Sequence, residues 1–150
     1  MDEAMLRIEP AAASDLPNIL KLLSECELPQ DGFKEHMDAA IVGRDGQAVI
    51  GSAALELYGS SALLRSVAVS PSNRSCGLGK RLVSAALELA RQKGVVRVYL
   101  LTMTAPDYFP KFGFHPIERT RFPSEVQQSV EFTSACPASA VAMELSLFNE

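Results

Sequence analysis

The chain has 150 residues, of which 47% are hydrophobic and 21% are charged, and its formal net charge at pH 7 is −4. This composition is that of an ordinary globular domain, and the negative balance excludes a basic surface that would favour nucleic acid or an anionic membrane. No apolar run is long enough to span a bilayer, and Asp2 and Glu3 precede any hydrophobic stretch. We therefore expect one soluble, cytoplasmic domain, residues 1–150, without a signal peptide.

The cysteines and histidines do not form a metal-binding pattern. Cys26, Cys76 and Cys136 are widely spaced and include no CxxC pair, which argues against a disulfide framework or a zinc site and suits a reducing compartment. We expect each to be a small buried or incidental residue rather than a thiolate ligand. Two histidines are too few for a histidine-built metal centre, so we expect no metal. His36 is expected in solvent and His115 at a strand edge.

The first predicted elements are a strand and a helix. Residues 5–11 alternate between apolar and polar types, as a short strand does, and residues 14–28 carry apolar side chains at helical spacing. Ser14 or Asp15 can cap this helix. Residues 31–39 are predicted as a weaker helix or an irregular lobe.

Residues 39–69 read as an antiparallel meander. Asp45-Gly46 separates two β-prone runs, and this dipeptide is a strong hairpin signal. A second break begins at Gly59. The predicted strands are residues 39–44, 47–58 and 62–69.

The second half of the chain adds the clearest helix and several further elements. Residues 79–94 have an apolar stripe that ends at Gly94, where a C-terminal cap belongs. Residues 95–103 are nearly continuously apolar, which is typical of a strand buried on both faces. The rest is predicted as a helical turn ended by Gly113, a strand, a helix with a Ser124/Gln127 capping box and a last strand: residues 105–114, 115–122, 123–130 and 140–147. This order predicts an α/β or α+β fold with a mixed sheet flanked by helices.

The junction between the meander and this helix, SPSNRSCGLGKRLV (residues 70–83), suggests an anion site. Two glycines follow a strand and precede a helix, so the N–H groups of residues 76–81 can point into one concavity at the positive end of the helix. Arg74, Lys80 and Arg81 add charge-assisted contacts at its rim. The expected ligand is a pyrophosphate, although a purely structural loop is the alternative for this stretch alone.

Two common nucleotide motifs do not fit the loop. A Rossmann fingerprint needs a third glycine after Gly77 and Gly79, and Leu82 stands there. A P-loop needs a hydroxyl residue after Gly-Lys, and Arg81 stands there.

A third pattern fits better. Arg74-Ser-Cys-Gly77-Leu-Gly79 matches the [RQ]-x-x-G-x-[GA] signature of the GNAT superfamily of N-acetyltransferases, and APDYFPKFGF (residues 105–114) is similar to the second motif of that family. The resemblance covers roughly residues 5–119. It implies the GNAT fold, a central, mostly antiparallel sheet that splays open, with acetyl-CoA as co-substrate.

The resemblance also implies which residues contact the cofactor. The strand before the loop would pair with the pantetheine arm, so that a main-chain N–H polarises the thioester carbonyl, and the loop would hold the pyrophosphate. Carried over to this chain, the contacts come from Val67, Ala68, Val69, Arg74, Ser75, Cys76, Gly77, Leu78, Gly79, Lys80, Arg81, Thr102 and Phe109.

The catalytic acid and base depart from the family pattern. Phe109 occupies the position of the usual acid, a tyrosine, and Tyr108 lies one residue earlier, about 100° round a helix. We expect Tyr108 either to be the acid or to pack as an aromatic residue. The strand glutamate that often serves as base is also missing, since Leu63 stands near that position. Glu56 is the candidate base, with a solvated strand residue as the alternative.

Two further resemblances suggest the acceptor. VYLLTMTAPDYFPKFGFHPIERTRFP resembles amino-acid N-acetyltransferases, including those that act on glutamate, and SVEFTSACPASAVAMEL (residues 129–145) resembles small acetyltransferases of arsenic-resistance operons. They imply an amino-acid acceptor, an organoarsenical one included. Arg65 is the expected partner of its carboxylate, and pairing with a neighbouring glutamate is the alternative. Arg119 and Arg121 either close the site or lie exposed in a loop.

The sequence thus predicts an acetyl-CoA-dependent N-acetyltransferase of small amines, linked to arsenic resistance, with neither nucleic acid nor membrane as a partner. An acyltransferase for longer chains and a CoA-binding sensor without catalysis are the alternatives. A homodimer is compatible with the apolar last strand, residues 140–147.

Overall fold

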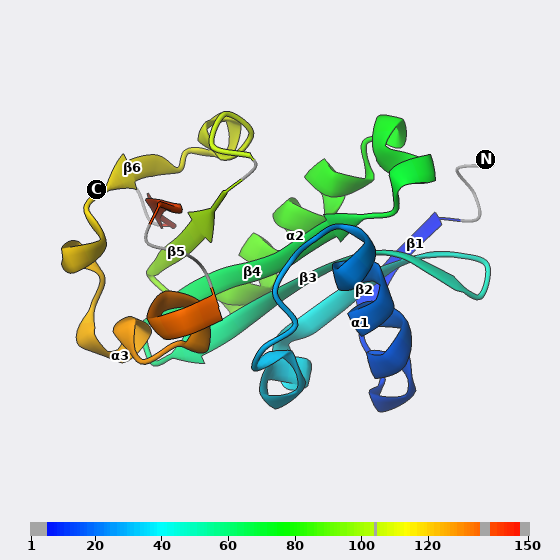
Figure 1. Ribbon diagram of the computed structural model, residues 1–150, viewed down its shortest axis with the longest axis horizontal. Coiled ribbons are helices and arrows are strands. Elements are labelled where there is room, and N and C mark those ends of the chain that lie inside the picture. The colour runs from blue at the N-terminus through cyan, green and yellow to red at the C-terminus, as the bar shows by residue number, and fades with distance from the viewer. Residues whose placement is uncertain (1–5, 104, 136–138, 148–150) are drawn as a thin grey trace.

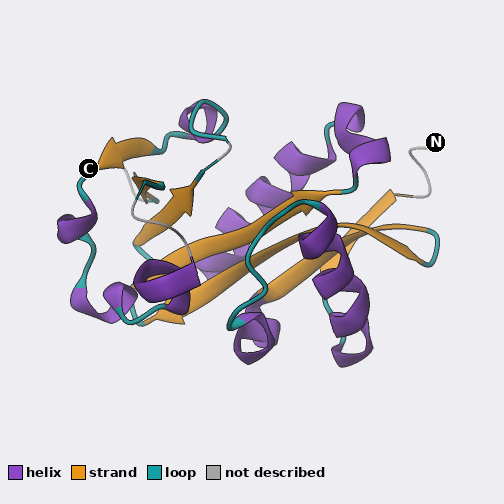
Figure 2. Ribbon diagram, in the orientation of Figure 1, coloured by secondary structure: helices purple, strands orange, loops and turns teal. Residues whose placement is uncertain are grey.

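The protein is built around one seven-stranded sheet with helices on both faces (Figures 1 and 2). The computed structural model describes residues 6–103, 105–135 and 139–147. The strands are β1 (Leu6–Pro10), β2 (Ala40–Asp45), β3 (Ala48–Tyr58), β4 (Ser61–Val69), β5 (Arg97–Thr102), β6 (His115–Ile117) and β7 (Val141–Ser146). Their order in the sheet is β1-β2-β3-β4-β5-β7-β6, and every neighbouring pair is antiparallel except β4–β5, which is parallel.

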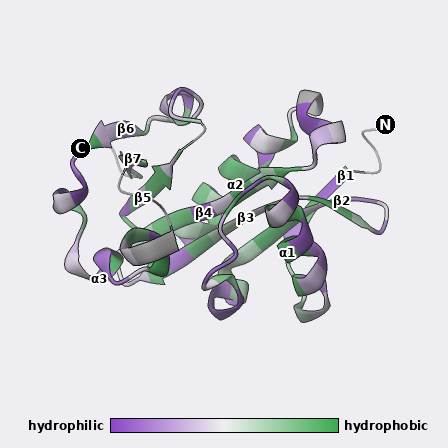
Figure 3. Cartoon of the chain, viewed as in Figure 1, coloured by the Kyte–Doolittle hydropathy of each residue, from purple (hydrophilic) through white to green (hydrophobic). Residues whose placement is uncertain are grey.

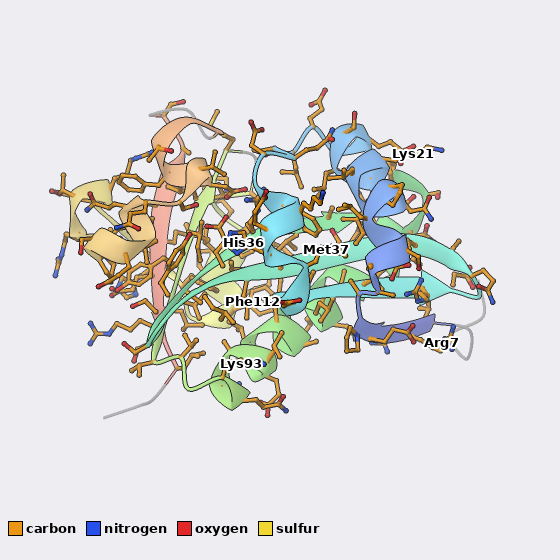
Figure 4. All side chains as sticks on the ribbon, turned by 90° about the horizontal axis from the view of Figure 1, so that it is seen from below. Arg7, Lys21, His36, Met37, Lys93 and Phe112 are labelled. Carbon is orange, nitrogen blue, oxygen red and sulfur yellow. The ribbon has the colours of Figure 1, made fainter. Side chains whose placement is uncertain are left out.

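The longer helices are α1 (Leu16–Glu25) and α2 (Leu78–Gln92), and they cover opposite faces of the sheet (Figures 1 and 4). A short helix, α3 (Ser124–Gln127), and a single π-helical turn (Glu131–Ala135) follow β6. The remaining helical pieces are 3₁₀ segments at Ala13–Asp15, Phe33–Ala39, Pro71–Cys76, Phe109–Phe112 and Arg119–Arg121.

Alternation along the central strands produces two separate apolar layers. On one face, Leu82 and Val83 of α2 pack against Leu55 and Leu64; on the other, Ile19 of α1 belongs to a cluster with Ala54, Ala68 and Phe33. Since successive strand residues point to opposite faces, adjacent residues of β3 serve different layers. Figure 3 shows hydrophobic residues gathered along these strands.

The sheet opens between β4 and β5. These parallel strands pair only over Ser61–Leu63 and Arg97–Tyr99. Beyond that point β4 stays with β3, whereas β5 pairs along its whole length with β7. The two strands therefore diverge, which confirms the predicted splayed sheet.

A bulge in β4 lies within the diverging part. Ala54 faces Arg65 and Ser52 faces Ala68, so Ser66 and Val67 together oppose Ala53. Ser66 has a φ of +59°, which is uncommon for a residue other than glycine. The extra residue puts Val67 on the α2 face of the sheet, where Leu64 also lies.

Most predicted elements are confirmed. Asp15 is the N-cap of α1 by position, but its side chain makes no capping hydrogen bond to that helix. The larger differences fall in the second half of the chain. The strand predicted for residues 115–122 ends at Ile117 and continues as a 3₁₀ turn. The capping box at Ser124 is wrong: Pro123 is the N-cap, and the Gln127 amide donates instead to the carbonyl of Phe122 at 2.8 Å. The last strand pairs on both sides, with β5 and with β6, so its backbone is not a free edge for a dimer.

None of the described helices is long and apolar enough to cross a membrane. Within residues 6–103, 105–135 and 139–147, no group of three or more His, Cys, Asp or Glu side chains is placed to hold a metal ion. Cys26 is a free thiol whose sulfur lies 3.5 Å from the Val69 carbonyl oxygen, and Cys136 lies outside the described residues.

Candidate active site

The free edge of β4 forms one wall of the candidate site. Ser70 donates its N–H to the carbonyl of Ile50 at 2.8 Å, and in an antiparallel ladder such groups alternate between the two sides of a strand. The N–H and C=O groups of Val67 and Val69 therefore point away from β3, towards the side where β5 has diverged, and the Val69 carbonyl accepts a bond from Arg74 there. An extended ligand can pair with this edge as a further strand would.

The N-terminus of α2 stands at the end of that edge. Gly77 is the N-cap, with a left-handed φ of 78° that favours glycine, and the first backbone bond runs from the Arg81 N–H to the Gly77 carbonyl. The N–H groups of residues 78–80 precede that bond, so they carry the positive end of the helix dipole. Leu78 is buried and anchors the turn, whereas Lys80 and Arg81 are exposed beside it. This arrangement confirms the predicted strand–loop–helix geometry.

Arg74, one of the three cations expected at the rim of the anion site, bonds to other groups of the protein. The Nε of Arg74 donates to the Val69 carbonyl at 3.1 Å, and its Nη2 lies 3.5 Å from the Cys26 sulfur. These bonds hold an exposed arginine against the end of β4.

Tyr108 reaches the same place from the turn after β5. A Cβ added to Gly79 would lie 3.0 Å from the Tyr108 hydroxyl and 3.6 Å from a methyl carbon of Val69. Glycine at 79 therefore leaves room for the hydroxyl against the first turn of α2. Burial raises the pKa of Tyr108, so its hydroxyl stays protonated at neutral pH.

Phe109 and Thr102, two further residues predicted to contact the cofactor, have partners within the protein. Phe109 is buried in the α2-side core, and its ring packs edge-on to those of Tyr108 and Phe114 at 5.3 and 5.9 Å between centroids. The Thr102 hydroxyl accepts the N–H of Ala105 at 3.1 Å, at the end of β5. Cofactor contacts by Phe109 and Thr102 stay predictions.

A buried charged cluster lies on the opposite face of the sheet, beside the bulge. The side chain of Glu56 is fully buried; the Tyr58 hydroxyl donates to its Oε1 at 2.5 Å, and Arg65 Nη1 donates to its Oε2 at 2.7 Å. Burial by itself raises the pKa of Glu56, but hydrogen bonds from Tyr58, Ser129 and Arg65 hold it below its usual value. The solvated alternative for Glu56 is wrong, because its carboxylate is enclosed and hydrogen-bonded.

Arg65 connects this cluster to several segments. Its Nε donates to the Ser66 hydroxyl at 3.1 Å and lies 3.4 Å from Oε2 of Glu131, while its Nη2 lies 3.4 Å from the carbonyl of Pro29. Pairing with a neighbouring glutamate, the alternative for Arg65, is thus present. Contact with a substrate stays a prediction, and it requires one of these partners to move.

Two residues of the cluster, His36 and Glu131, were not predicted from the sequence to belong to a site. His36, expected in solvent, has a side chain only 26% exposed, and its Nε2 lies 3.8 Å from Oε2 of Glu56. Figure 4 labels it on the 3₁₀ segment that follows α1. Glu131 comes from the π-helical turn far along the chain. A charged residue in the middle of β4 was the one available signal that buried partners would be needed.

His115, Arg119 and Arg121 belong to β6 and the 3₁₀ turn that follows it. Arg119 donates from Nη2 to the Phe132 carbonyl at 2.9 Å, and its guanidinium lies over that ring. Arg121 and His115 line an open depression of about 580 Å³ at the edge formed by β6 and β7. His115 is exposed there, as predicted for a strand edge.

Comparison with known proteins agrees with this geometry. The model of the acetyltransferase (GNAT) family matches residues 6–114. The amino-acid acetyltransferase of Aeromonas salmonicida is 30% identical over 138 residues, covering 84% of this chain and 30% of that protein. An uncharacterized N-acetyltransferase of Chlorobaculum tepidum is 30% identical over 115 residues, covering 75% of this chain and 71% of that protein. The chain therefore spans less than a third of the length of the first relative and most of the second.

Solved structures show the same fold. N-acetylglutamate synthase of Neisseria gonorrhoeae, complexed with coenzyme A and L-arginine, superposes with a TM-score of 0.81 at 21% identity, over 98% of this chain and 34% of that one. Rv2747 of Mycobacterium tuberculosis, in complex with CoA and NLQ, gives 0.80 at 25% identity, over 95% and 99%. With the family model covering well over half of the sequence, and with the splayed sheet and glycine loop in place, this chain belongs to the acetyltransferase (GNAT) family.

Proposed function

We propose that the protein transfers the acetyl group of acetyl-CoA directly to the amine of an amino acid. The observation that carries this proposal is the free edge of β4, which leads through the gap beside β5 to the N-terminus of α2. That continuous path suits a ligand with an extended arm and a pyrophosphate. Relatives named as amino-acid acetyltransferases support the acceptor class.

The cofactor would lie along this path. The amides at the start of α2, together with Ser75, Cys76 and Gly77 before it, would receive the pyrophosphate, and Lys80, Arg81 and Arg74 would add charge at its rim. The backbone of Val67, Ala68 and Val69 would hold the pantetheine arm. The N–H and C=O groups that face the gap are those of Val67 and Val69.

The chemistry follows from this placement. The neutral amine attacks the thioester carbon, the C–N bond forms, the carbonyl oxygen gains negative charge, and collapse of the adduct breaks the C–S bond. A main-chain N–H at the bulge would stabilise the charged oxygen. Tyr108, held protonated by burial, would give its proton to the CoA thiolate and regain one from the nitrogen of the adduct, which loses that proton as it becomes the amide.

The acceptor ammonium must first lose a proton. Glu56 is enclosed, and both of its oxygens accept hydrogen bonds, so it does not meet the amine directly. His36 is the partly exposed neighbour of that carboxylate. We place Glu56 behind His36, as the group that stabilises the imidazolium formed when His36 takes the proton.

Arg65 is the proposed partner of the acceptor carboxylate, because it is a buried guanidinium beside the bulge where the acetyl carbonyl would lie. The organoarsenical acceptor and the link to arsenic resistance rest on the resemblance of residues 129–145, of which residues 136–138 lie outside the described part. We include an organoarsenical amino acid among the acceptors to be tested.

Release of free thiol from acetyl-CoA across a panel of amines tests the function. The panel holds L-glutamate, its phosphinic and arsinic analogues, other α-amino acids and amines without a carboxylate. Turnover confined to amino acids supports the proposal, and turnover confined to an arsinic analogue supports the arsenic link. Binding of CoA without turnover of any amine contradicts the proposal and favours a CoA-binding sensor.

A further inference from the structure

Arg65 is shared by two carboxylates that it holds unequally. Its Nη1 donates to Glu56 at 2.7 Å, the geometry of a strong charge-assisted bond. Its other edge, formed by Nε and Nη2, has longer contacts: 3.1 Å to the Ser66 hydroxyl, 3.4 Å to Glu131 and 3.4 Å to the Pro29 carbonyl. This second edge has the two-donor geometry that a carboxylate fits best.

Both carboxylates beside Arg65 are buried. The side chains of Glu56 and Glu131 are 0% and 5% exposed, and Glu56 already pairs with the guanidinium at 2.7 Å. The Glu131 carboxylate therefore lies at the second edge of a buried guanidinium, where an entering carboxylate would meet the same donors.

Glu131 belongs to a turn that is also held by contacts away from Arg65. The π-helical turn Glu131–Ala135 is held by Arg119, which donates to the Phe132 carbonyl, and by the ring of Phe122, 5.4 Å from that of Phe132. Single π turns are rare and occur often at functional sites. Glu131 extends from this turn to the second edge of Arg65, beside the bulge.

We propose that the Glu131 carboxylate occupies the place of the acceptor carboxylate on Arg65 and thereby sets the affinity and the selectivity for acceptors. When an amino acid binds, its carboxylate replaces that of Glu131, and the turn carrying Glu131 moves away from the sheet. This inference rests on the proposed function, because it needs an acceptor with a carboxylate.

Charge balance favours such an exchange. One carboxylate replaces another, so the buried guanidinium remains paired in both states, and the Glu131 carboxylate that leaves it becomes hydrated as the turn moves away from the sheet. An amine without a carboxylate has nothing to offer the second edge of Arg65 and leaves Glu131 in place. Glu131 would therefore discriminate against such amines.

The test is Glu131→Gln, which keeps the size of the side chain and removes its charge. The acceptors are L-glutamate and L-alanine, each compared with its α-carboxamide. Without a competing carboxylate, the KM of the amino acids falls by about threefold to tenfold, and the KM of the carboxamides does not change. Glu131→Asp restores the charge and brings the KM back toward that of the wild type. Glu125→Gln removes an exposed carboxylate and serves as the control.

The sign of the change separates this role from a structural one. If Glu131 only held the site together, Glu131→Gln would raise the KM of every acceptor. Wild-type turnover of an amino acid with a raised or unchanged KM in Glu131→Gln overturns this inference alone. An absence of turnover with every amino acid, in both proteins, overturns the proposed function and this inference with it.

Discussion

Tyr108 and Phe109 are adjacent in the sequence but face different surroundings. Phe109, at the position of the family's tyrosine, lies in the core, whereas the Tyr108 hydroxyl lies against the first turn of α2. The sequence predicted that the two side chains would diverge, because neighbours on a helix differ by about 100°. It could not show which one reaches the gap, since that depends on how the turn packs against β4 and α2.

Tyr108→Phe tests whether the hydroxyl acts as the acid. The phenyl ring keeps the contacts with Phe109 and Phe112, so the fold should be unaffected. We expect kcat with the best acceptor to fall by about tenfold or more, with little change in the KM for acetyl-CoA. Because the pKa of Tyr108 is raised, the wild type should lose activity only at high pH, and the variant should lack that limb of the profile. An unchanged kcat would leave Tyr108 with a packing role.

The cluster around Arg65 shows a second limit at the residue scale. A charged residue in the middle of a strand was predicted to bind the substrate or to pair with a neighbouring glutamate, and the structure supplies that glutamate as Glu56, on the adjacent strand. His36 and Glu131 join the cluster from segments that are distant in the sequence, and no local pattern predicts such contacts. The proposed roles of His36 as the base and of Glu131 as the competitor of the acceptor carboxylate therefore depend on the fold.

At the scale of elements, α2 and its loop were the most predictable part of the site. The apolar stripe and the glycines predicted a helix over residues 79–94, and the structure has it over Leu78–Gln92. Both signals are local: periodicity fixes the buried face, and a left-handed N-cap favours glycine. The register shift in β4 was not predictable, because no residue type demands Ser66 at a positive φ.

Gly79→Asp tests the role of this element. The substitution places a carboxylate at the start of α2, where the pyrophosphate is proposed to bind, so acetyl-CoA affinity should fall by about 100-fold or more, measured by isothermal titration. Ser84→Asp adds the same charge on an exposed position of the same helix and should bind acetyl-CoA nearly as well as the wild type. Gly79→Ala separates crowding of the Tyr108 hydroxyl from charge. Full affinity in Gly79→Asp would remove the pyrophosphate from this loop.

A second element-scale contact joins the start of α1 to the edge of the sheet. Arg44 donates two bonds to Asp15, at 2.9 and 2.6 Å, and one to Glu9 at 2.6 Å. The bonds from Arg44, and one from the Ala12 N–H, hold the pKa of Asp15 below its ordinary value of 3.8 although burial opposes this. A carboxyl with a lowered pKa adds stability that is fully present above 3.8 and is lost as the pH falls through its value in the folded protein.

Asp15→Asn should therefore reduce the free energy of unfolding by about 2 kcal/mol at pH 7. The difference in the free energy of unfolding between variant and wild type should shrink as the pH is lowered from about 5 to about 2. Urea denaturation at each pH measures this difference. Asp107→Asn, at an exposed position, is the control. A difference that stays constant over this range would mean that the ionised carboxylate is not what stabilises the contact.

At the scale of the whole molecule, the sequence predicted the elements but not the strand order. The meander of β2, β3 and β4 follows from its turns, whereas the placing of β7 between β5 and β6 depends on pairings across most of the chain. The splay of β4 from β5 was expected only through the family resemblance, since periodicity and turn signals do not report where two strands part. The result is a sheet with an open inner edge, where β4 offers backbone groups to a ligand.

That open edge predicts how the cofactor changes global stability. If acetyl-CoA fills the gap as a further strand and is absent from the unfolded chain, a concentration of 100 times its Kd should stabilise the protein by about 2.7 kcal/mol. For a chain of this length the midpoint of thermal unfolding should rise by about 5–10 °C. ATP has phosphates but no pantetheine arm, and at the same concentration as acetyl-CoA it should give a much smaller shift of the midpoint. Acetyl-CoA at that concentration should also give a much smaller shift with Gly79→Asp. Equal shifts with ATP and acetyl-CoA would mean that the phosphates alone are bound and that the edge of β4 does not contribute.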